Sequence, residues 1–177
     1  MKQNKKILMF VHTLYEEMEL HYPRYRLIEE GIEVVVAGPR KQEIYAGKHG
    51  YPCEADEAIA NIHHSHFDGL VIPGGYAPDK LRIIPEVLKI TQQMHHEGKL
   101  IAFICHAGWI PASAGILKGV KCTSYKAIKD DLIHAGAQWV DAPVVTDKNL
   151  ISSRHPNDLP VFCHAILEFL GTAHVTK

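Results

Sequence analysis

The sequence predicts an α/β protein with a mostly parallel, doubly wound central sheet. Two short apolar runs, residues 6–11 and 100–104, have the continuous hydrophobic character of strands that are buried on both faces. A third run, residues 33–37, is rich in β-branched side chains and follows the first after a helix-like segment. Strand, helix and strand in this order build parallel sheets. Because the chain has 177 residues, we expect a single domain over residues 1–177.

The segment between the first two strands has the end signals of a helix. Residues 16–31 begin with acidic side chains, which suit the positive end of a helix dipole, and Gly31 is a typical stop. Beyond the second strand, Gly47 and Gly50 separate short β-like pieces. We therefore expect residues 38–56 to form a hairpin at the edge of the main sheet.

The next strand, residues 68–72, ends in two glycines. Gly74 and Gly75 either let backbone amides approach a ligand closely or simply make a tight turn. A helix over residues 85–97 then leads into the strand at 100–104. Because neighbouring βαβ strands usually pair, we expect the carboxyl ends of these two strands to lie side by side.

The second half of the chain alternates short strands and helices. We expect strands at residues 121–124, 138–140, 144–146 and 149–153, and helices at residues 107–114, 127–135 and 159–170. Residues 171–177 are expected to form a loose tail.

The charge balance excludes several kinds of partner. The net charge is −1, with 19 basic and 20 acidic residues, so we expect neither nucleic acid nor a membrane surface as a partner. No apolar stretch approaches the roughly 20 residues that span a bilayer. The apolar run near the amino end is too short for a signal peptide. We therefore expect a cytoplasmic protein that acts on a small-molecule or peptide substrate.

Neither the cysteines nor the histidines indicate a metal centre. The cysteines form no C-x-x-C pair, which argues against a zinc knuckle or a disulfide framework; they are Cys53, Cys105, Cys122 and Cys163. Three histidines gather in a polar segment without acidic or cysteine partners at ligand spacing; they are His63, His64 and His66. We interpret them as surface residues and expect no metal and no cofactor.

Cys105 is the candidate nucleophile. It follows the apolar strand at residues 100–104 directly, and small residues after it permit a sharp turn into a helix. At such an elbow the side chain stands above the carboxyl end of the sheet, where the N–H groups of a helix start stabilise a thiolate. The alternative is a small buried core residue, which is the commoner role of cysteine.

Other strand ends supply the groups that thiol chemistry requires. A thiolate that attacks a carbonyl needs a base or orienting group and donors for the oxyanion. His106 and the backbone amides near Gly75 are candidates for these roles. An acidic residue after the first strand, Glu19, and a phenol, Tyr125, are expected at the same edge of the sheet.

Seven motifs follow one another along the chain. They are Tyr15-Glu16-Glu17-Met18-Glu19-Leu20, Gly47-Lys48-His49-Gly50-Tyr51, Pro73-Gly74-Gly75-Tyr76-Ala77-Pro78, Ala102-Phe103-Ile104-Cys105-His106, Thr123-Ser124-Tyr125, Ile128-Lys129-Asp130-Asp131 and Ser152-Ser153-Arg154. In this order they closely resemble the motifs of the ThiJ/PfpI family of intracellular cysteine proteases, in the class I glutamine-amidotransferase-like superfamily. The resemblance runs from residue 6 to about residue 170.

The resemblance implies a three-layer, flavodoxin-like sandwich with Cys105 at a nucleophile elbow. It implies that Glu19 lies near the sulfur and that the N–H groups of Gly75 and His106, beside Gly74, form an oxyanion hole. It also implies that an acid of a neighbouring subunit, at the position of Asp79, orients His106. We therefore expect a homodimer or a higher homo-oligomer.

The chain departs from the family pattern near this pair. Asp79 is one methylene shorter than the glutamate of the protease members, and Ala107-Gly108 replaces their Gly-Pro. Trp109 either narrows a substrate pocket or packs in the core. Tyr125 either contacts substrate or keeps its hydroxyl bonded within the protein.

Three functions agree with a reactive Cys105. The first is a cysteine-dependent hydrolase of peptide or amide bonds. The second is a glyoxalase or deglycase that acts on reactive carbonyls or their adducts. The third is a non-enzymatic stress-response, redox-sensing or chaperone-like protein in which the thiol is oxidised rather than turned over. The sequence alone does not separate them.

Overall fold

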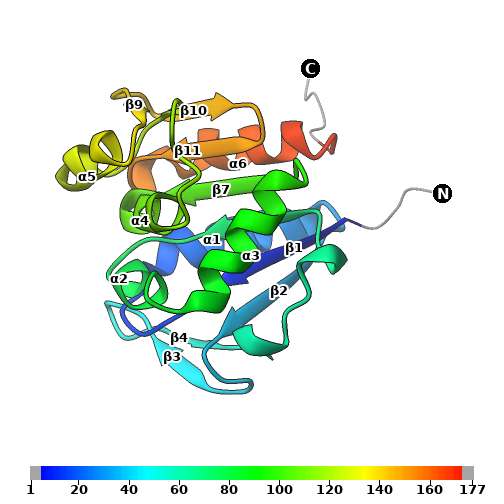
Figure 1. Cartoon of the computed structure of the whole chain (residues 1–177). Coiled ribbons are helices and arrows are strands. Elements are labelled where there is room, and N and C mark those ends of the chain that lie inside the picture. Colours follow the sequence, from blue (N-terminus) through cyan, green and yellow to red (C-terminus); the bar gives the residue numbers. More distant parts are fainter. Residues whose placement is uncertain (1–4, 173–177) are drawn as a thin grey trace.

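The centre of the protein is a seven-stranded sheet with the strand order β10-β11-β7-β6-β1-β2-β5 (Figure 1). The computed structural model describes residues 5–172. The strands of this sheet are β1 (Lys6–Phe10), β2 (Glu33–Gly38), β5 (Glu57–Ala58), β6 (Gly69–Ile72), β7 (Leu100–Ile104), β10 (Val144–Asp147) and β11 (Leu150–Ser153). Every pair is parallel except β10 with β11. The sheet confirms the predicted α/β class.

Helices cover both faces of this sheet, which gives three layers (Figure 1). The first helix, α1 (Glu17–Glu29), packs against the last, α6 (Leu159–Phe169), on one face. The other face carries α2 (Ala77–Leu81), α3 (Pro85–His96) and α4 (Trp109–Ser113). A further helix, α5 (Lys129–His134), packs beside α4. Within the described residues, no helix combines the length and apolar character that crossing a membrane requires.

The continuous apolar runs form the core of the sheet. All five residues of β7 and four of the five residues of β1 are buried. Burial on both faces is why these strands lack the alternation of a half-exposed strand. From β1 the chain proceeds outward to β2 and β5, then returns to β6 on the other side of β1. The carboxyl ends of β1, β6 and β7 therefore surround the point where the strand order reverses, where open α/β sheets bind ligands.

The expected edge hairpin is wrong in its placement. Strands β3 (Ile44–Ala46) and β4 (Pro52–Glu54) pair only with each other, and β5 forms the edge of the main sheet. Backbone hydrogen bonds instead tie the hairpin to the loop after β1, from Leu14 N–H to Ala46 O at 2.8 Å and from Lys48 N–H to Tyr15 O at 2.9 Å. The tip of the hairpin consequently lies above the carboxyl end of β1.

Other elements differ from the expectation in extent. The predicted strand at residues 121–124 is only β8 (Lys121–Cys122), which pairs in parallel with β9 (Gln138–Trp139) outside the main sheet. After Cys122 the backbone no longer pairs as a strand. The N–H of Thr123 donates instead to the side chain of Ser152, at 2.9 Å from Oγ. The chain also forms short 3₁₀ turns, η1 (Ile59–Asn61), η2 (His64–His66), η3 (Cys105–Gly108), η4 (Lys126–Ile128) and η5 (Pro156–Asp158).

Candidate active site

Cys105 occupies a strained turn between β7 and η3. Its φ angle is +62°, a left-handed conformation that a non-glycine residue adopts at a cost of about 1–3 kcal/mol. The carbonyl oxygen of Cys105 accepts the Tyr125 N–H at 3.2 Å, which helps to hold this turn. The side chain is 8% exposed and lines a pocket. The predicted elbow is therefore present, with the thiol at the carboxyl end of the sheet.

Two backbone N–H groups point at the sulfur of Cys105. They belong to Gly75 and His106, and each hydrogen bond lowers the pKa of the thiol. The φ angle of Gly75 is +77°, and a Cβ there would lie 2.5 Å from Glu16 N and 2.6 Å from Leu14 O. Only glycine therefore fits this position. Two donors in this arrangement also suit the oxyanion of a carbonyl under attack.

Glu19 brings a carboxyl group into the interior beside the thiol. Its side chain is fully buried, and Oε2 accepts the Gly74 N–H at 2.8 Å. Oε1 has no hydrogen-bond partner among residues 5–172. Burial raises the pKa of Glu19 to about 8, so its neutral form prevails at pH 7. The N–H of Gly74 therefore donates its hydrogen bond to Glu19, whereas the N–H of Gly75 donates to the sulfur of Cys105.

The thiol is less acidic than its position at an elbow suggested. Burial, followed by the negative charge of an ionised Glu19, raises the pKa of Cys105 to about 12. The N–H groups of Gly75 and His106 oppose this rise but do not outweigh it. When Glu19 is protonated, its repulsion of a thiolate is absent. The protonation state of Glu19 therefore controls how readily Cys105 ionises.

The imidazole of His106 lies against the sulfur. Its Nδ1 is 3.3 Å from Cys105 Sγ, and burial together with the charge of Lys48 lowers its pKa. The rings of Tyr125 and Trp109 flank it, with centroids 5.0 Å and 5.3 Å away. Within the described part of this chain, no carboxylate pairs with His106.

Three of the predicted site residues lie outside the pocket wall, namely Gly74, Asp79 and Trp109. Asp79 is exposed on α2 and has no side-chain partner within residues 5–172. Trp109 is half-buried behind His106, and its Nε1–H donates to Asp131 Oδ2 at 2.7 Å. Trp109 therefore supports the imidazole and does not narrow the pocket. Tyr125, by contrast, lines the pocket and has an exposed ring.

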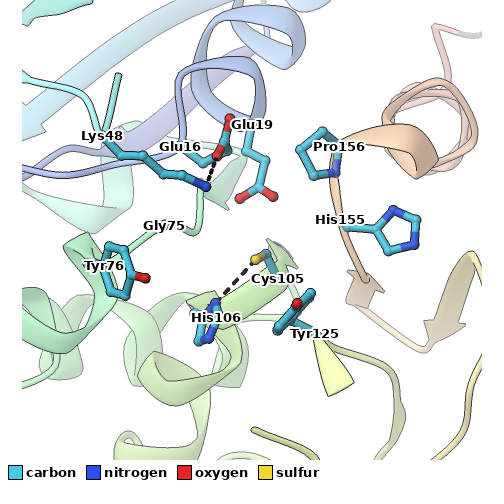
Figure 2. A pocket seen from close by; sticks show the side chains of 10 residues that line it. All are labelled: Glu16, Glu19, Lys48, Gly75, Tyr76, Cys105, His106, Tyr125, His155 and Pro156. Atoms are coloured by element: carbon cyan, nitrogen blue, oxygen red, sulfur yellow. Dashed lines mark hydrogen bonds and ion pairs between the residues drawn. The ribbon is translucent and has the colours of Figure 1, made fainter. Parts of the chain in front are cut away.

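One cavity of about 220 Å³ joins these groups (Figure 2). Its wall includes residues that sequence reasoning did not select, namely Glu16, Lys48, Tyr76, His155 and Pro156. Lys48 comes from the β3–β4 hairpin, and its Nζ pairs with Glu16 Oε2 at 2.8 Å. The motif that contains it, Gly47-Lys48-His49-Gly50, was recognised in the sequence, but no role was assigned to the lysine. His155 follows β11, a strand whose direction could not be read from the sequence.

The three neighbouring histidines do not gather as metal ligands. His64 Nε2 lies 2.8 Å from Glu97 Oε1, and the rings of His63 and His66 are 5.6 Å apart. Within the described residues, the one group of potential ligands that comes together is Glu16, Glu17 and His49. Glu16 already pairs with Lys48, and Glu17 with His49 at 2.9 Å.

The chain resembles known proteins over nearly its whole length. Residues 5–169 match the DJ-1/PfpI family. "Deglycase PfpI" of Pyrococcus furiosus is 45% identical over 93% of this chain and 99% of that protein. "Putative cysteine protease YraA" of Bacillus subtilis is 35% identical over 94% of this chain and 99% of that protein. The crystal structure of Drosophila melanogaster DJ-1beta superposes with a TM-score of 0.90, at 31% identity, over 97% of this chain and 92% of that one.

Fold, elbow and relatives together define an α/β enzyme of the cysteine-hydrolase class. The chain belongs to the DJ-1/PfpI family. This confirms the resemblance that the sequence motifs indicated.

Proposed function

We propose that Cys105 is the nucleophile of a hydrolase that releases an amine from a small carbonyl-bearing substrate. The observation that supports this most directly is the pair of N–H groups, from Gly75 and His106, that converge on the sulfur. When a thiolate adds to a carbonyl carbon, the carbonyl oxygen becomes negatively charged. Donors that already point to this place stabilise that charge without reorganisation.

Glu19 activates the thiol in this proposal. With a pKa of about 8, Glu19 carries a proton at pH 7, and its otherwise unpartnered Oε1 is available to donate to the sulfur. Figure 2 shows its carboxyl group above Cys105 in the pocket. While Glu19 is neutral it does not repel a thiolate, and a hydrogen bond from its O–H would stabilise a negative charge on the sulfur. The N–H groups of Gly75 and His106 stabilise the same charge.

The size of the pocket favours a small substrate. A cavity of about 220 Å³ lies below the roughly 300–1,000 Å³ that enclose drug-sized ligands. One aminoacyl group or one carbonyl adduct of an amine fits this space better than several residues of a peptide. Relatives named deglycase share 44–45% identity with this chain. We therefore propose deglycase activity, the removal of a carbonyl adduct from an amine.

Peptide hydrolysis is the second candidate. Asp79 is exposed without a partner in the described chain, so a neighbouring subunit's copy of this residue is available to orient His106. A relative is named putative cysteine protease. In this case the active form is a homodimer or higher homo-oligomer. Because relatives are named as enzymes, we propose turnover at Cys105 in preference to a purely sensing role.

A substrate comparison tests the proposal. Amine release is measured from a methylglyoxal adduct of an amino acid and from an aminoacyl or peptidyl amide with the same amino acid. We expect both reactions to vanish in Cys105→Ala, with the adduct as the better substrate of the wild type. Adduct turnover that survives in Cys105→Ala would refute the proposal.

We also propose a cytoplasmic location. All four cysteines are free and buried, which suits a reducing compartment. Fractionation of cells that produce the protein tests this, and recovery in a secreted fraction would contradict it.

A further inference from the structure

Lys48 brings a positive charge to the pocket from the tip of the β3–β4 hairpin. Among the described residues that line the cavity, it is the one lysine or arginine. Its side chain keeps 39% of its surface exposed. Figure 2 shows its ammonium group extended from the hairpin toward the carboxyl groups of Glu16 and Glu19. Attack by the thiol of Cys105 does not in itself require this charge.

The ion pair with Glu16 leaves part of the ammonium group available. Nζ lies 2.8 Å from Glu16 Oε2, and within residues 5–172 Glu16 is its one acidic partner. An ammonium group has three N–H donors. The Glu16 side chain is only 9% exposed, so the carboxylate is the buried member of the pair and the ammonium group is the accessible one. Lys48 therefore has donors left for a ligand in the pocket.

The ammonium group is charged at neutral pH and acts on the reactive groups. Its hydrogen bond to Glu16 raises the pKa of Lys48, and a negative charge on Cys105 or Glu19 raises it further. Burial, and then the charge of Lys48, lowers the pKa of His106. These mutual effects show that the ammonium group lies within electrostatic range of the atoms at which a substrate reacts.

A carboxylate is the ligand that these features favour. A negatively charged group beside the thiolate of Cys105 is repelled unless a cation lies close to it. Because Glu16 already offsets much of the charge of Lys48, a single negative charge matches the pair better than a doubly charged phosphate does. A cavity of about 220 Å³ also admits only a compact anion.

We infer that Lys48 binds a carboxylate of the substrate beside the reacting carbonyl group. This inference rests on the proposed function and defines its substrate class, a carbonyl adduct or amide with one negative charge near the reacting carbon. The carboxylate belongs to the amine half in a derivative of a free amino acid, and to the carbonyl half in a derivative of a 2-oxo acid. An adduct on a lysine side chain within a protein carries no such carboxylate and is the poorer substrate.

Two pairs of small ligands that differ in charge test this site. N-acetylalanine and N-acetylalaninamide place the carboxylate or its amide on the amine half, whereas N-methyloxamate and N-methyloxamide place it on the acyl half. Each ligand is titrated against the rate at which iodoacetamide alkylates Cys105, at pH 8 and constant ionic strength. In at least one pair, we expect the carboxylate to halve this rate at about a tenfold lower concentration than its amide does. The pair that shows this preference identifies the half of the substrate that carries the charge.

Lysine variants supply the controls. In Lys48→Met the two members of each pair should protect Cys105 at concentrations within about threefold of each other. Lys48→Arg keeps the charge and should retain the preference for the carboxylate. A general effect of Lys48 on the ionisation of Cys105 changes the rate without ligand and cancels within a pair. Lys41→Met, outside the pocket, should behave as the wild type does.

The inference fails if carboxylate and amide protect the wild type equally in both pairs, or if neither carboxylate protects it. A preference that survives in Lys48→Met would also overturn the inference, because another group would then bind the carboxylate. Protection requires no turnover, so these results do not depend on whether Cys105 is a hydrolytic nucleophile. Failure of the proposed function appears instead as substrate turnover by Cys105→Ala.

Discussion

The carboxyl group of Glu19 and the thiol of Cys105 lie together in the interior, and the charge of one controls the ionisation of the other. The two groups come from α1 and from the end of β7, which the reversal of strand order brings together. An ionised Glu19 opposes the formation of a thiolate, whereas a protonated Glu19 does not. The pair is therefore best understood as one site that loses its first proton as a unit.

Replacement of Glu19 by glutamine should stabilise the protein and weaken its activity. Burial raises the pKa of Glu19 from 4.5 to about 8, so the folded state binds this proton more tightly than the unfolded chain does. Wild-type stability therefore falls as the pH rises from about 4.5 to about 8. At pH 7 we expect Glu19→Gln to gain on the order of 3 kcal/mol, measured by chemical denaturation.

The pH dependence supplies the control for this prediction. At pH 4 the carboxyl group is protonated in folded and unfolded wild type alike, so the gain in stability should disappear. Turnover should fall at least about tenfold at pH 7, because the amide N–H of glutamine is a weaker hydrogen-bond donor to a thiolate than the O–H of a carboxylic acid. A variant that is less stable than wild type at pH 8 would contradict the account of Glu19.

Gly74→Ala should separate Glu19 from Cys105. A Cβ at this position would lie 2.5 Å from Glu19 Oε2 and 2.7 Å from Cys105 Cβ, so the two side chains must move. We expect a loss of about 1–3 kcal/mol in stability and at least a tenfold loss of turnover. Gly98→Ala is the matched control, because its φ is +70° but nothing lies near its Cβ. It should lose about 1 kcal/mol and keep its activity, and parallel losses of activity in both variants would count against the prediction.

Lys48→Met should shift the ionisation of the site to higher pH. The charge of Lys48 lowers the pKa of Glu19 and of His106, and its partner Glu16 raises the pKa of Glu19. Removal of the lysine therefore raises the pKa of both groups. The alkylation rate of Cys105, measured against pH, should rise at a higher pH than in wild type. Lys41→Met, outside the pocket, should leave the profile unchanged, and a shift to lower pH in Lys48→Met would exclude this electrostatic role.

Peptide hydrolysis should depend on assembly if Asp79 of a neighbour orients His106. Specific activity toward a peptide amide should then fall on dilution, as light scattering records dissociation. Asp79→Asn should lower this activity at high concentration while it leaves the rate of Cys105 alkylation unchanged. A monomer that keeps full peptidase activity would exclude the contribution of Asp79 from a neighbour.

The pocket was predictable where residues follow strands of the main sheet. Cys105, Glu19 and Gly75 come together because the carboxyl ends of parallel strands meet at one edge. Short apolar runs identified these strands, and glycines marked their ends. Residues that depend on long-range pairing were not predictable in this way. His155 reaches the pocket because β11 pairs in parallel with β7, which local sequence does not determine.

The position of the β3–β4 hairpin was not predictable from the sequence either. Glycines between short β-like pieces indicated β3 and β4, but the position of the hairpin depends on hydrogen bonds from Leu14 to Ala46 and from Lys48 to Tyr15. Because these hydrogen bonds join backbone atoms, the identity of the side chains does not reveal them. They place Lys48 in the pocket wall, a residue that appeared in a motif without an assigned role. The helix α2 was missed because only the glycines before it were interpreted, although Pro78 in its first turn is a typical helix start.

Site-specific alkylation tests the central claim most directly. Iodoacetamide at pH 8, followed by intact-mass measurement and peptide mapping, relates modification to turnover in the same sample. We predict a single adduct on Cys105, with activity lost in proportion to it. The other cysteines, Cys53, Cys122 and Cys163, should stay unmodified because they are buried away from the pocket. A protein with Cys105 fully modified that still turns over its substrate would contradict the claim that this thiol is the nucleophile.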